Sequence, residues 1–248
     1  MTEQVKAVVL AAGKGTRLHT GEGDAPKVMR EVCGKPLLWY VLDALSFIDK
    51  KDVVLVVGYK KDSVIDSFGG YTYALQNEQL GTGHAVLAAR DKLEGHTGAL
   101  LLCYGDMPAI KRELYEKLLK THFEQCNDCT LLTGKSDLAM SFGRIIRDEN
   151  GSFMHVAEEK DCTPAEYAIT ELNTGVYVFD TPMLLDALKE LRNDNAQGEY
   201  YVTDVPAIMK GKGAKIGILK CDLGDDIIGV NTLGQLEMAE RIMSKRSG

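Results

Sequence analysis

Residues 5–17 read VKAVVLAAGKGTR, a nearly continuous apolar run that leads directly into a glycine-rich turn, and this stretch decides the fold class. An apolar run without alternation indicates a strand that is covered on both faces, as in a parallel sheet between helices. We therefore expect residues 5–11 to form a buried strand. The loop that follows would open at the carboxyl end of that strand, which is the edge where open α/β sheets bind their ligands.

Two further apolar runs extend this pattern through the first half of the chain. VVLVV at residues 53–57 and ALLLCY at residues 99–104 are predicted as buried strands. Strands that alternate with helices predict an α/β, Rossmann-like fold, with a mixed, mostly parallel sheet and helices on both faces. The helices are expected in the amphipathic stretches at residues 36–47, 82–93 and 112–123.

The second half of the chain is less regular. The sequence has no internal repeat and no linker rich in Pro, Gly or Ser, which favours a single domain over residues 1–248. Shorter apolar runs predict strands at residues 130–133, 143–147, 153–157 and 175–179. Further helices are predicted at residues 183–191, 203–210 and 232–243.

The bulk composition narrows the class of protein. A chain of 248 residues with 45% hydrophobic residues can bury one substantial core. Its formal net charge of −7 argues against a broad nucleic-acid surface, which needs an excess of clustered Lys and Arg. Residues 1–10 lack the pattern of a signal peptide, and no apolar run is long enough to cross a bilayer. We therefore expect a cytoplasmic protein that binds neither nucleic acid nor membrane.

The cysteines and histidines indicate no metal or redox centre. Four of the six cysteines have no near neighbour in sequence, so reduced thiols are the simplest interpretation. Cys126 and Cys129 form a CxxC without the second Cys or His pair that a zinc site needs. The five histidines show neither HxxxH nor HExxH spacing, and we assign none of them to a metal or to general base catalysis.

The loop after the first strand has the composition of an anion cradle. Gly13 and Gly15 carry no Cβ, so the backbone can approach a phosphate closely and present successive N–H groups to it. Arg17 and Lys27 add the local positive charge that a phosphate needs in an acidic protein. The motif is neither a P-loop nor GxGxxG, because Leu18 stands where the third glycine would be. Taken alone, the loop fits a purely structural turn as well.

Asp106 is a candidate metal ligand from its position alone. It follows an apolar strand and a glycine, so its carboxylate is expected at the carboxyl edge of the sheet. Hard oxygen ligands at such an edge, shared with substrate phosphates, are what Mg²⁺ prefers. A turn or helix-cap aspartate is an equal alternative, and Asn231 has the same alternative as a cap of the last helix.

The segment LAAGKGTR at residues 10–17, followed by Pro26 and Lys27, resembles the signature of the sugar nucleotidyltransferase superfamily. Five further segments narrow the resemblance to the uridylyltransferase domain of bacterial N-acetylglucosamine-1-phosphate uridylyltransferases. The match runs in collinear order over essentially the whole chain, so the motifs are specific as a set. The five segments are QNEQLGTGHA at residues 76–85, YGDMP at 104–108, ELNTGVY at 171–177, NDNAQGEYYVTD at 193–204 and GVN at 229–231.

The resemblance implies both a fold and a reaction. The fold would be of the nucleotide-diphospho-sugar transferase type, with a nucleotide-binding part at about residues 1–130, a sugar-binding part at 131–231 and a C-terminal helix at 232–245. The reaction would transfer the uridylyl group of UTP to N-acetylglucosamine 1-phosphate, giving UDP-N-acetylglucosamine and pyrophosphate, a cell-envelope precursor reaction. UTP and the sugar 1-phosphate would be the partners, whereas the oligomeric state is not predicted.

The resemblance also implies two sets of substrate-binding residues. Gln76 and the turn at residues 81–82 would face the uracil, because an amide offers both a donor and an acceptor to a pyrimidine edge. The nucleotide would be bound by Leu10, Ala12, Gly13, Gly15, Gln76, Gln79, Gly81 and Thr82. The sugar phosphate would be bound by Tyr104, Gly105, Gly143, Glu158, Asn173, Tyr201 and Thr203.

Mg²⁺ is the implied cofactor, held by Asp106 and Asn231. Arg17 and Lys27 would be the catalytic cations, which steady the charge on the leaving pyrophosphate. An oxygen of the sugar 1-phosphate would attack the α-phosphorus of UTP. Because this oxygen is already anionic at neutral pH, the reaction needs no dedicated base.

The chain departs from the family pattern in two places. The stretch HTGEGDA at residues 19–25 is longer than the corresponding loop of the family, which leaves open how Lys27 is positioned and whether UTP is the only nucleotide. The hexapeptide repeats of the β-helix acetyltransferase that follows in the bifunctional enzymes are absent from this sequence. We therefore do not carry the acetyl-transfer activity over to this chain.

Three alternatives to this function differ in what they require. The same chemistry on another sugar 1-phosphate or with another nucleoside triphosphate would use the same motifs. A non-catalytic nucleotide-sensing module would be expected to have a damaged metal site, yet Arg17, Lys27, Asp106 and Asn231 are all present. A dinucleotide-dependent oxidoreductase is disfavoured by the missing third glycine.

Overall fold

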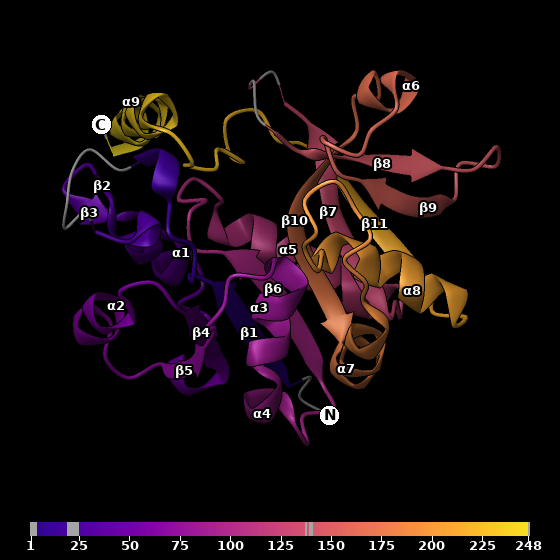
Figure 1. Cartoon of the computed structure of the whole chain (residues 1–248), viewed down its shortest axis with the longest axis horizontal. Helices are drawn as coiled ribbons and strands as arrows, with labels where there is room; N and C mark the ends of the chain where they lie inside the picture. Colours follow the sequence, from indigo (N-terminus) through magenta and orange to yellow (C-terminus); the bar gives the residue numbers. More distant parts are fainter. Residues whose placement is uncertain (1–3, 19–24, 137, 139–140, 248) are drawn as a thin grey trace.

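The computed structural model describes residues 4–18, 25–136, 138 and 141–247. Within these ranges the chain folds around a nine-stranded mixed sheet (Figure 1). The main path of the sheet runs in the order β11-β7-β10-β6-β1-β4-β5, and the β8–β9 hairpin branches from β10. The strands of this sheet are Val5–Leu10 (β1), Val53–Val57 (β4), Thr72–Leu75 (β5), Ala99–Tyr104 (β6), Cys129–Lys135 (β7), Gly143–Arg147 (β8), Phe153–Ala157 (β9), Leu172–Asp180 (β10) and Ile216–Asp222 (β11). A separate ribbon pairs Glu31–Val32 (β2) with Lys35–Pro36 (β3).

The first half of the chain forms the parallel part of the sheet. β1 pairs in parallel with β4 and β6, and β4 pairs in parallel with β5. Successive residues of β1 enter different cores: Ala7 and Val9 pack on one face of the sheet, whereas Val8 and Leu10 pack on the other. Burial on both faces explains why the strand shows no polar alternation, and it confirms the predicted fold class.

The second half of the chain adds strands that run in both directions. β10 runs antiparallel to both β6 and β7, and β7 pairs in parallel with β11 at the edge. The strand predicted at residues 175–179 is shorter than β10, which spans Leu172–Asp180. β5 and β11 were not predicted from the sequence, since the first is four residues long and the second alternates between partly exposed and buried positions.

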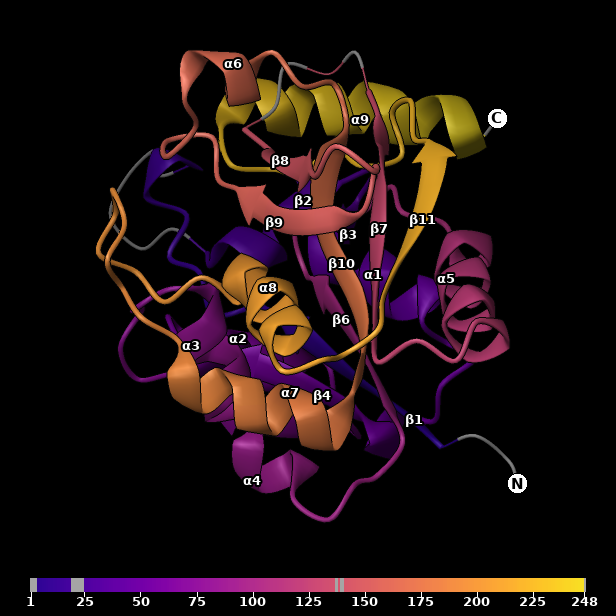
Figure 2. The same ribbon diagram turned by 90° about the vertical axis from the view of Figure 1, so that its right-hand side faces the viewer.

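Helices cover both faces of the sheet. Figure 2 shows α5 on one side of the sheet and α7 and α8 on the other. The C-terminal helix α9 packs beside β2, where its Ala239, Ile242 and Met243 bury a third apolar cluster against Leu18 and Val230. The α-helices are Leu37–Ala44 (α1), Lys61–Ser67 (α2), Thr82–Ala88 (α3), Arg90–Leu93 (α4), Arg112–Glu124 (α5), Pro164–Tyr167 (α6), Thr181–Ala187 (α7), Val205–Gly211 (α8) and Leu233–Ser247 (α9).

Two predicted helices have different bounds in the structure. The helix expected at residues 82–93 is two helices, because the chain turns at Ala89 between α3 and α4. The helix expected at residues 183–191 begins at Thr181, where the carboxylate of Asp180 caps the first turn, and α7 gives way to a 3-10 turn after Ala187.

The last two predicted helices are close to their observed positions. The helix expected at residues 203–210 begins as a 3-10 turn at Val202–Asp204 and continues as α8, in which Pro206 occupies the first turn. The helix expected at residues 232–243 is α9 and extends to Ser247. None of the helices within the described ranges has the length and apolarity that a membrane crossing demands.

Two further regions were singled out in the sequence. The long loop expected at residues 19–25 lies outside the described residues except for Ala25. Cys126 and Cys129 are both free thiols, and Cys129 is buried at the start of β7 while Cys126 is exposed.

Candidate active site

The loop after β1 folds around the stem of Lys27. Gly15 has a φ of +64°, a left-handed conformation that glycine adopts without strain. A Cβ at Gly15 would lie 2.7 Å from the Cβ of Lys27, and a Cβ at Gly13 would lie 3.6 Å from its Cε. A 3-10 turn at Thr16–Leu18 follows, in which the Leu18 N–H donates to the Gly15 carbonyl at 2.8 Å. The two glycines therefore let the loop and the lysine stem lie against each other.

Lys27 joins the two predicted metal ligands. Its Nζ forms an ion pair with Asp106 Oδ2 and donates a hydrogen bond of 3.0 Å to Asn231 Oδ1. The side chains of Lys27 and Asp106 are only 18% and 10% exposed, so water and salt screen this pair weakly. The Val230 N–H also donates to the Asp106 carbonyl at 3.0 Å. Asp106 and Asn231 come from opposite halves of the chain, and the structure brings them together beside the glycine-rich loop.

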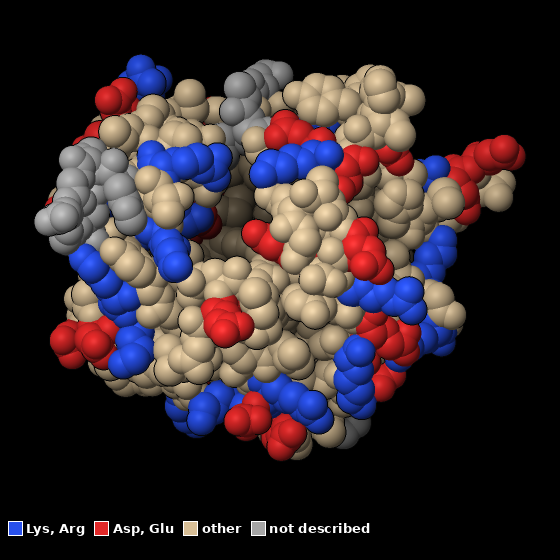
Figure 3. Space-filling view, in the orientation of Figure 1, with Lys and Arg blue, Asp and Glu red and all other residues tan. Residues whose placement is uncertain are grey.

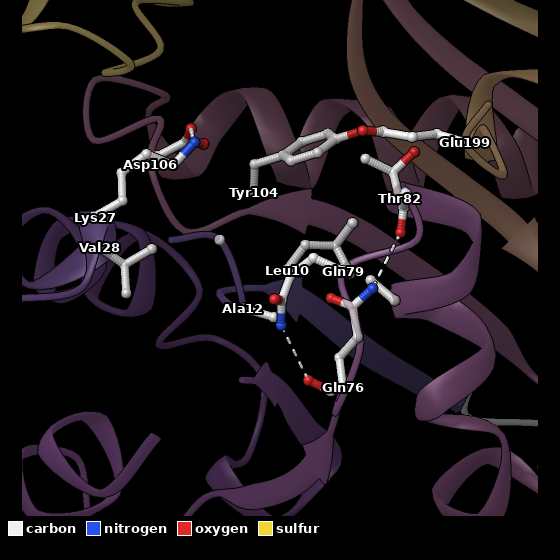
Figure 4. A pocket seen from close by; sticks show the side chains of 13 residues that line it. Leu10, Ala12, Lys27, Val28, Gln76, Gln79, Thr82, Tyr104, Asp106 and Glu199 are labelled. Atoms are coloured by element: carbon white, nitrogen blue, oxygen red, sulfur yellow. Dashed lines mark hydrogen bonds and ion pairs between the residues drawn. The ribbon is translucent and has the colours of Figure 1, made fainter. Parts of the chain in front are cut away.

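A first cavity opens beside this point. Figure 4 shows Lys27 and Asp106 on one side of it and Gln76 and Gln79 on another. Seven of the eight residues predicted to bind the nucleotide line this cavity, whereas Gly15 faces the stem of Lys27 instead. The seven are Leu10, Ala12, Gly13, Gln76, Gln79, Gly81 and Thr82.

The amide of Gln76 is held in place in the first cavity. Gln76 is only 4% exposed. Its Nε2 donates to the Gly81 carbonyl at 3.1 Å and lies 3.2 Å from His84 Nδ1, and its backbone carbonyl accepts from Gln79 Nε2 at 3.3 Å. Gly81 itself has a φ of +112°, and a Cβ there would lie 2.6 Å from the Tyr200 carbonyl oxygen. The turn therefore requires glycine, and the glutamine amide presents a fixed pattern of donor and acceptor.

A second cavity of about 350 Å³ adjoins the first. Arg17 and Asn231 line it together with six of the seven residues predicted to bind the sugar phosphate. Gly105 is the exception, because a Cβ there would lie 3.1 Å from Leu38 Cδ1 and from Val28 Cγ1, so the glycine allows close packing at the end of β6. The six are Tyr104, Gly143, Glu158, Asn173, Tyr201 and Thr203.

The two cavities meet at a shared wall. Figure 3 shows the molecular surface hollowed at this face, with basic side chains along the left rim of the hollow. Because some side chains line both cavities, ligands in the two cavities would meet beside Lys27 and Asp106. The side chains that line both are Lys27, Thr82, Tyr104, Asp106 and Glu199.

Burial sets the electrostatics of the second cavity. Burial raises the pKa of Glu158, although the hydrogen bond that Thr203 Oγ1 donates to it at 2.8 Å opposes the rise. Asn173 is only 4% exposed, and its Nδ2 donates to the Tyr177 hydroxyl at 2.7 Å. Its Oδ1 is buried and has no hydrogen-bond partner among the described residues. Buried acceptors are rarely left unsatisfied, which marks Asn173 as a candidate ligand-binding residue of this cavity.

Gln197 and Glu199 are two of the polar residues of the second cavity that were missed from the sequence. Gln197 and Glu199 both line it, and Gln197 Nε2 donates to the Tyr201 hydroxyl at 2.8 Å. Both lie in the segment at residues 193–204 that carries part of the family resemblance. The resemblance indicated that this segment contributes to the site. Only the fold shows which of its side chains line the cavity.

Gln235 is a third missed residue, and it supports a predicted metal ligand. Its Oε1 accepts from the backbone N–H groups of Asn231 and Thr232 at 2.8 and 3.1 Å. In return, the Gln235 N–H donates to Thr232 Oγ1 at 3.3 Å. This is a capping box, and the Thr-x-x-Gln spacing at residues 232–235 is its sequence signature.

Comparison with known proteins identifies the family of the chain. The family model described as the MobA-like NTP transferase domain matches residues 7–202. The bifunctional protein GlmU of Lactobacillus gasseri is 44% identical over 240 residues, which cover 96% of this chain and 51% of that protein. The bifunctional protein GlmU of Exiguobacterium sp. is 45% identical over 242 residues, which cover 97% of this chain and 53% of that protein. The chain thus spans about half the length of the curated relatives it matches.

A solved structure shares the fold. The putative glucose-1-phosphate thymidylyltransferase from Bacillus anthracis, crystallised in complex with a sucrose, superposes with a TM-score of 0.73 over 96% of this chain and 95% of that chain. At 20% sequence identity this likeness concerns the fold alone. The family model, by contrast, covers most of the chain, including the glycine-rich loop and Asp106. The chain therefore belongs to the family of MobA-like NTP transferase domains and is a nucleotidyltransferase.

Proposed function

We propose that the chain transfers the uridylyl group of UTP to N-acetylglucosamine 1-phosphate and releases pyrophosphate. The observation that carries this proposal is the meeting of the two cavities at Lys27 and Asp106. A nucleotide in the first cavity and a sugar phosphate in the second would present their phosphates to each other at that point. The choice of UTP and N-acetylglucosamine rests on the sequence resemblance, and the identity of 44% to a protein named GlmU over 96% of the chain supports it.

Asp106 and Asn231 are the residues that would hold Mg²⁺. Asp106 Oδ2 and Asn231 Oδ1 contact the same ammonium group, so both oxygens lie within reach of one cation. Among the described residues, no group of three or more His, Cys, Asp or Glu side chains is arranged to hold a metal ion. Two protein oxygens nevertheless fit Mg²⁺, which usually keeps several waters and completes its shell with substrate phosphates. When bound, the ion would offset the negative charge of the two phosphates that are joined.

The other residues of the first cavity would orient the nucleotide. The Gln76 Nε2 already donates to the Gly81 carbonyl, so the amide would offer its Oε1 as an acceptor to an N–H of the uracil edge. Gly81 and Thr82 line the same cavity and would lie beside the base. The N–H groups of the loop at residues 13–17, together with Arg17 and Lys27, would neutralise the phosphates. Lys27 from the wall shared by both cavities, and Arg17 from the second cavity, would offset the charge that builds on the departing pyrophosphate.

The residues of the second cavity would orient the sugar. The Glu158 carboxylate and the Asn173 amide would accept hydrogen bonds from the hydroxyl and amide groups of an N-acetyl sugar. An oxygen of the sugar 1-phosphate would form the new bond to the α-phosphorus. The bond from that phosphorus to the β-phosphate oxygen would break at the same time, and pyrophosphate would leave with its electron pair. Orientation and charge neutralisation would supply the catalysis.

A pyrophosphate-release assay tests this proposal. The protein is incubated with Mg²⁺, with each of four nucleoside triphosphates and with a panel of sugar 1-phosphates. We expect release only with UTP and N-acetylglucosamine 1-phosphate, and the variant Asp106→Asn serves as the inactive control. Release with another pair would reassign the substrates within the same chemistry. Release with no pair would favour a nucleotide-sensing module instead.

A further inference from the structure

The Lys27 ammonium lies on the same two oxygens that the proposed metal site requires. It forms an ion pair with Asp106 Oδ2 and donates to Asn231 Oδ1 at 3.0 Å. Both side chains of the ion pair are largely buried, at 18% and 10% exposure. A group that contacts both oxygens at once occupies the space between them. An ion coordinated by both oxygens would need that same space.

The ammonium and a divalent ion exclude each other for two reasons. Mg²⁺ binds oxygen at about 2.1 Å, whereas an ammonium hydrogen bond is about 2.8 Å long, so a metal on both oxygens would lie within contact distance of the nitrogen. Two cations at such a separation also repel strongly, since this partly buried position is weakly screened. One must therefore leave before the other binds.

The fold gives the ammonium another place to go. The aliphatic stem of Lys27 lies along Gly13 and Gly15. Because these two residues have no Cβ, the lysine side chain can run close to the backbone of the loop. Lys27 also lines both cavities, so open space lies beside its side chain on two sides. A phosphate on the loop at residues 13–17 would offer the ammonium a new anionic partner.

We propose that Lys27 is a built-in competitor of the divalent metal for Asp106 and Asn231, and that a phosphate-bearing ligand releases it. This inference rests on the metal site of the proposed function. In the absence of such a ligand, the ammonium keeps the intrinsic affinity of the site for Mg²⁺ low. When the metal arrives together with a triphosphate, the metal takes the two oxygens and Lys27 moves to the phosphates. The same step that seats the metal thus delivers Lys27 to the reacting groups.

The test measures metal binding directly, without substrates. Mn²⁺ replaces Mg²⁺ as a spectroscopic probe. Mn²⁺ is titrated into the protein, and electron paramagnetic resonance measures the concentration of Mn²⁺ that stays free. Lys27→Met removes the charge but keeps an unbranched side chain of similar length. We expect this variant to bind Mn²⁺ about ten-fold more tightly than the unaltered protein, or more, because the competing cation is gone.

Two control variants show where the gain arises. Lys51→Met removes the same net charge from an exposed lysine paired with Asp49, and we expect no change in Mn²⁺ affinity. The double variant Lys27→Met with Asp106→Asn should lose the whole gain. Circular dichroism establishes that each variant is folded.

Three results would overturn the inference. These are a folded Lys27→Met variant that binds Mn²⁺ no better than the unaltered protein, an equal gain in Lys51→Met, or a gain that survives Asp106→Asn. Because the titration contains no nucleotide or sugar, its outcome does not depend on which transfer reaction the protein carries out. Failure of the proposed reaction would instead show in the pyrophosphate-release assay.

Discussion

Single residues at the site are constrained by what lies next to them. Gly81 and Gly175 both have positive φ, and a Cβ at Gly175 would collide with the ring of Tyr104. Neither contact can be inferred from the sequence, because Tyr104 and Tyr200 are brought there by other elements. The sequence does predict Gly81 as a nucleotide-binding residue. Gly175 lies in a segment that carries the family resemblance, but it was not predicted as a site residue. The physical role of both glycines is to let side chain or backbone approach where a Cβ would block it.

Gly81→Ala is expected to lower both stability and nucleotide affinity. The new Cβ would meet the Tyr200 carbonyl, and alanine is strained at a φ of +112°. We expect a loss of about 2–3 kcal/mol in the free energy of unfolding and an increase of about ten-fold in the KM for UTP. Urea denaturation and initial rates measure the two effects.

Gly95→Ala is the matched control for Gly81→Ala. Gly95 also has a positive φ, but a Cβ there would meet nothing within 4 Å. Its expected loss of about 1 kcal/mol reports backbone strain alone, with an unchanged KM for UTP. Equal effects of the two substitutions on stability would mean that the contact with Tyr200 is unimportant.

Asp106→Asn is expected to lower kcat by about 10²-fold or more, the scale for losing one preorganised electrostatic group. The amide keeps the shape of the side chain but loses the charge that attracts both Lys27 and a divalent ion. Steady-state kinetics at saturating UTP and circular dichroism provide the measurement. Near-normal turnover of the folded variant would remove Asp106 from the proposed metal site.

At the scale of the elements, the sequence predicts best where burial alone determines the pattern. β1, β4 and β6 are buried over all or most of their length, and their apolar runs mark them clearly. Asp106 could be proposed as a site residue because it follows β6. The edge strand β11 carries Lys220 and Asp222, and it forms only because β7 offers it a partner. Glu199 could not be singled out, since its position depends on a loop fixed by contacts such as the Asn195 Nδ2 bond to its carbonyl at 2.6 Å.

The first turn of α9 is expected to set the metal requirement of the enzyme. Gln235 Oε1 holds the backbone of Asn231 and Thr232, so Gln235→Leu frees the segment that carries the proposed ligand. We expect the Mg²⁺ concentration needed for half-maximal turnover to rise about ten-fold, the scale for lost support of a metal ligand, while the KM for the sugar phosphate changes little.

Gln235→Glu distinguishes positioning from simple helix stability. A glutamate keeps the oxygen acceptors for the two N–H groups and should restore the normal Mg²⁺ requirement. If Gln235→Glu behaved like Gln235→Leu, the hydrogen bonds to residues 231 and 232 would not be what positions Asn231.

At the scale of the whole molecule, one buried carboxylate ties together three strands from the second half of the chain. Glu171 accepts hydrogen bonds from Thr133 of β7, Arg147 of β8 and Lys220 of β11 at 2.7–3.1 Å. Burial alone would raise the pKa of Glu171, but the bonds from Arg147, Lys220 and Thr133 outweigh it and lower the pKa to about 2. The sequence could not show this network, because its members are scattered over the second half of the chain.

The Glu171 network is expected to make the fold sensitive to acid. A carboxyl group with a lower pKa in the folded state stabilises the protein above its unfolded pKa of about 4.3 and loses that contribution as the pH falls towards 2. Glu171→Gln should therefore lower the free energy of unfolding at pH 7 by about 2 kcal/mol, a figure that allows for the partly exposed partners. It should also weaken the decline in stability between about pH 5 and pH 3, as measured by urea denaturation.

Glu94→Gln is the matched control for Glu171→Gln. Glu94 pairs with Arg90, and its side chain is 62% exposed. The substitution should change the free energy of unfolding by less than about 0.5 kcal/mol, both at pH 7 and between about pH 5 and pH 3. A similar acid dependence in Glu171→Gln and the unaltered protein would show that the network does not govern acid unfolding.

The bond between the Val230 N–H and the Asp106 carbonyl has a consequence for the newly made chain. A ribosome delivers the glycine-rich loop, Gln76 and Asp106 long before it delivers Asn231, and domains begin to fold from the N-terminal side. A nascent polypeptide could thus assemble its nucleotide pocket early while one proposed metal ligand is still untranslated. Turnover would begin only after the C-terminal segment has docked, so incomplete chains would not consume triphosphate.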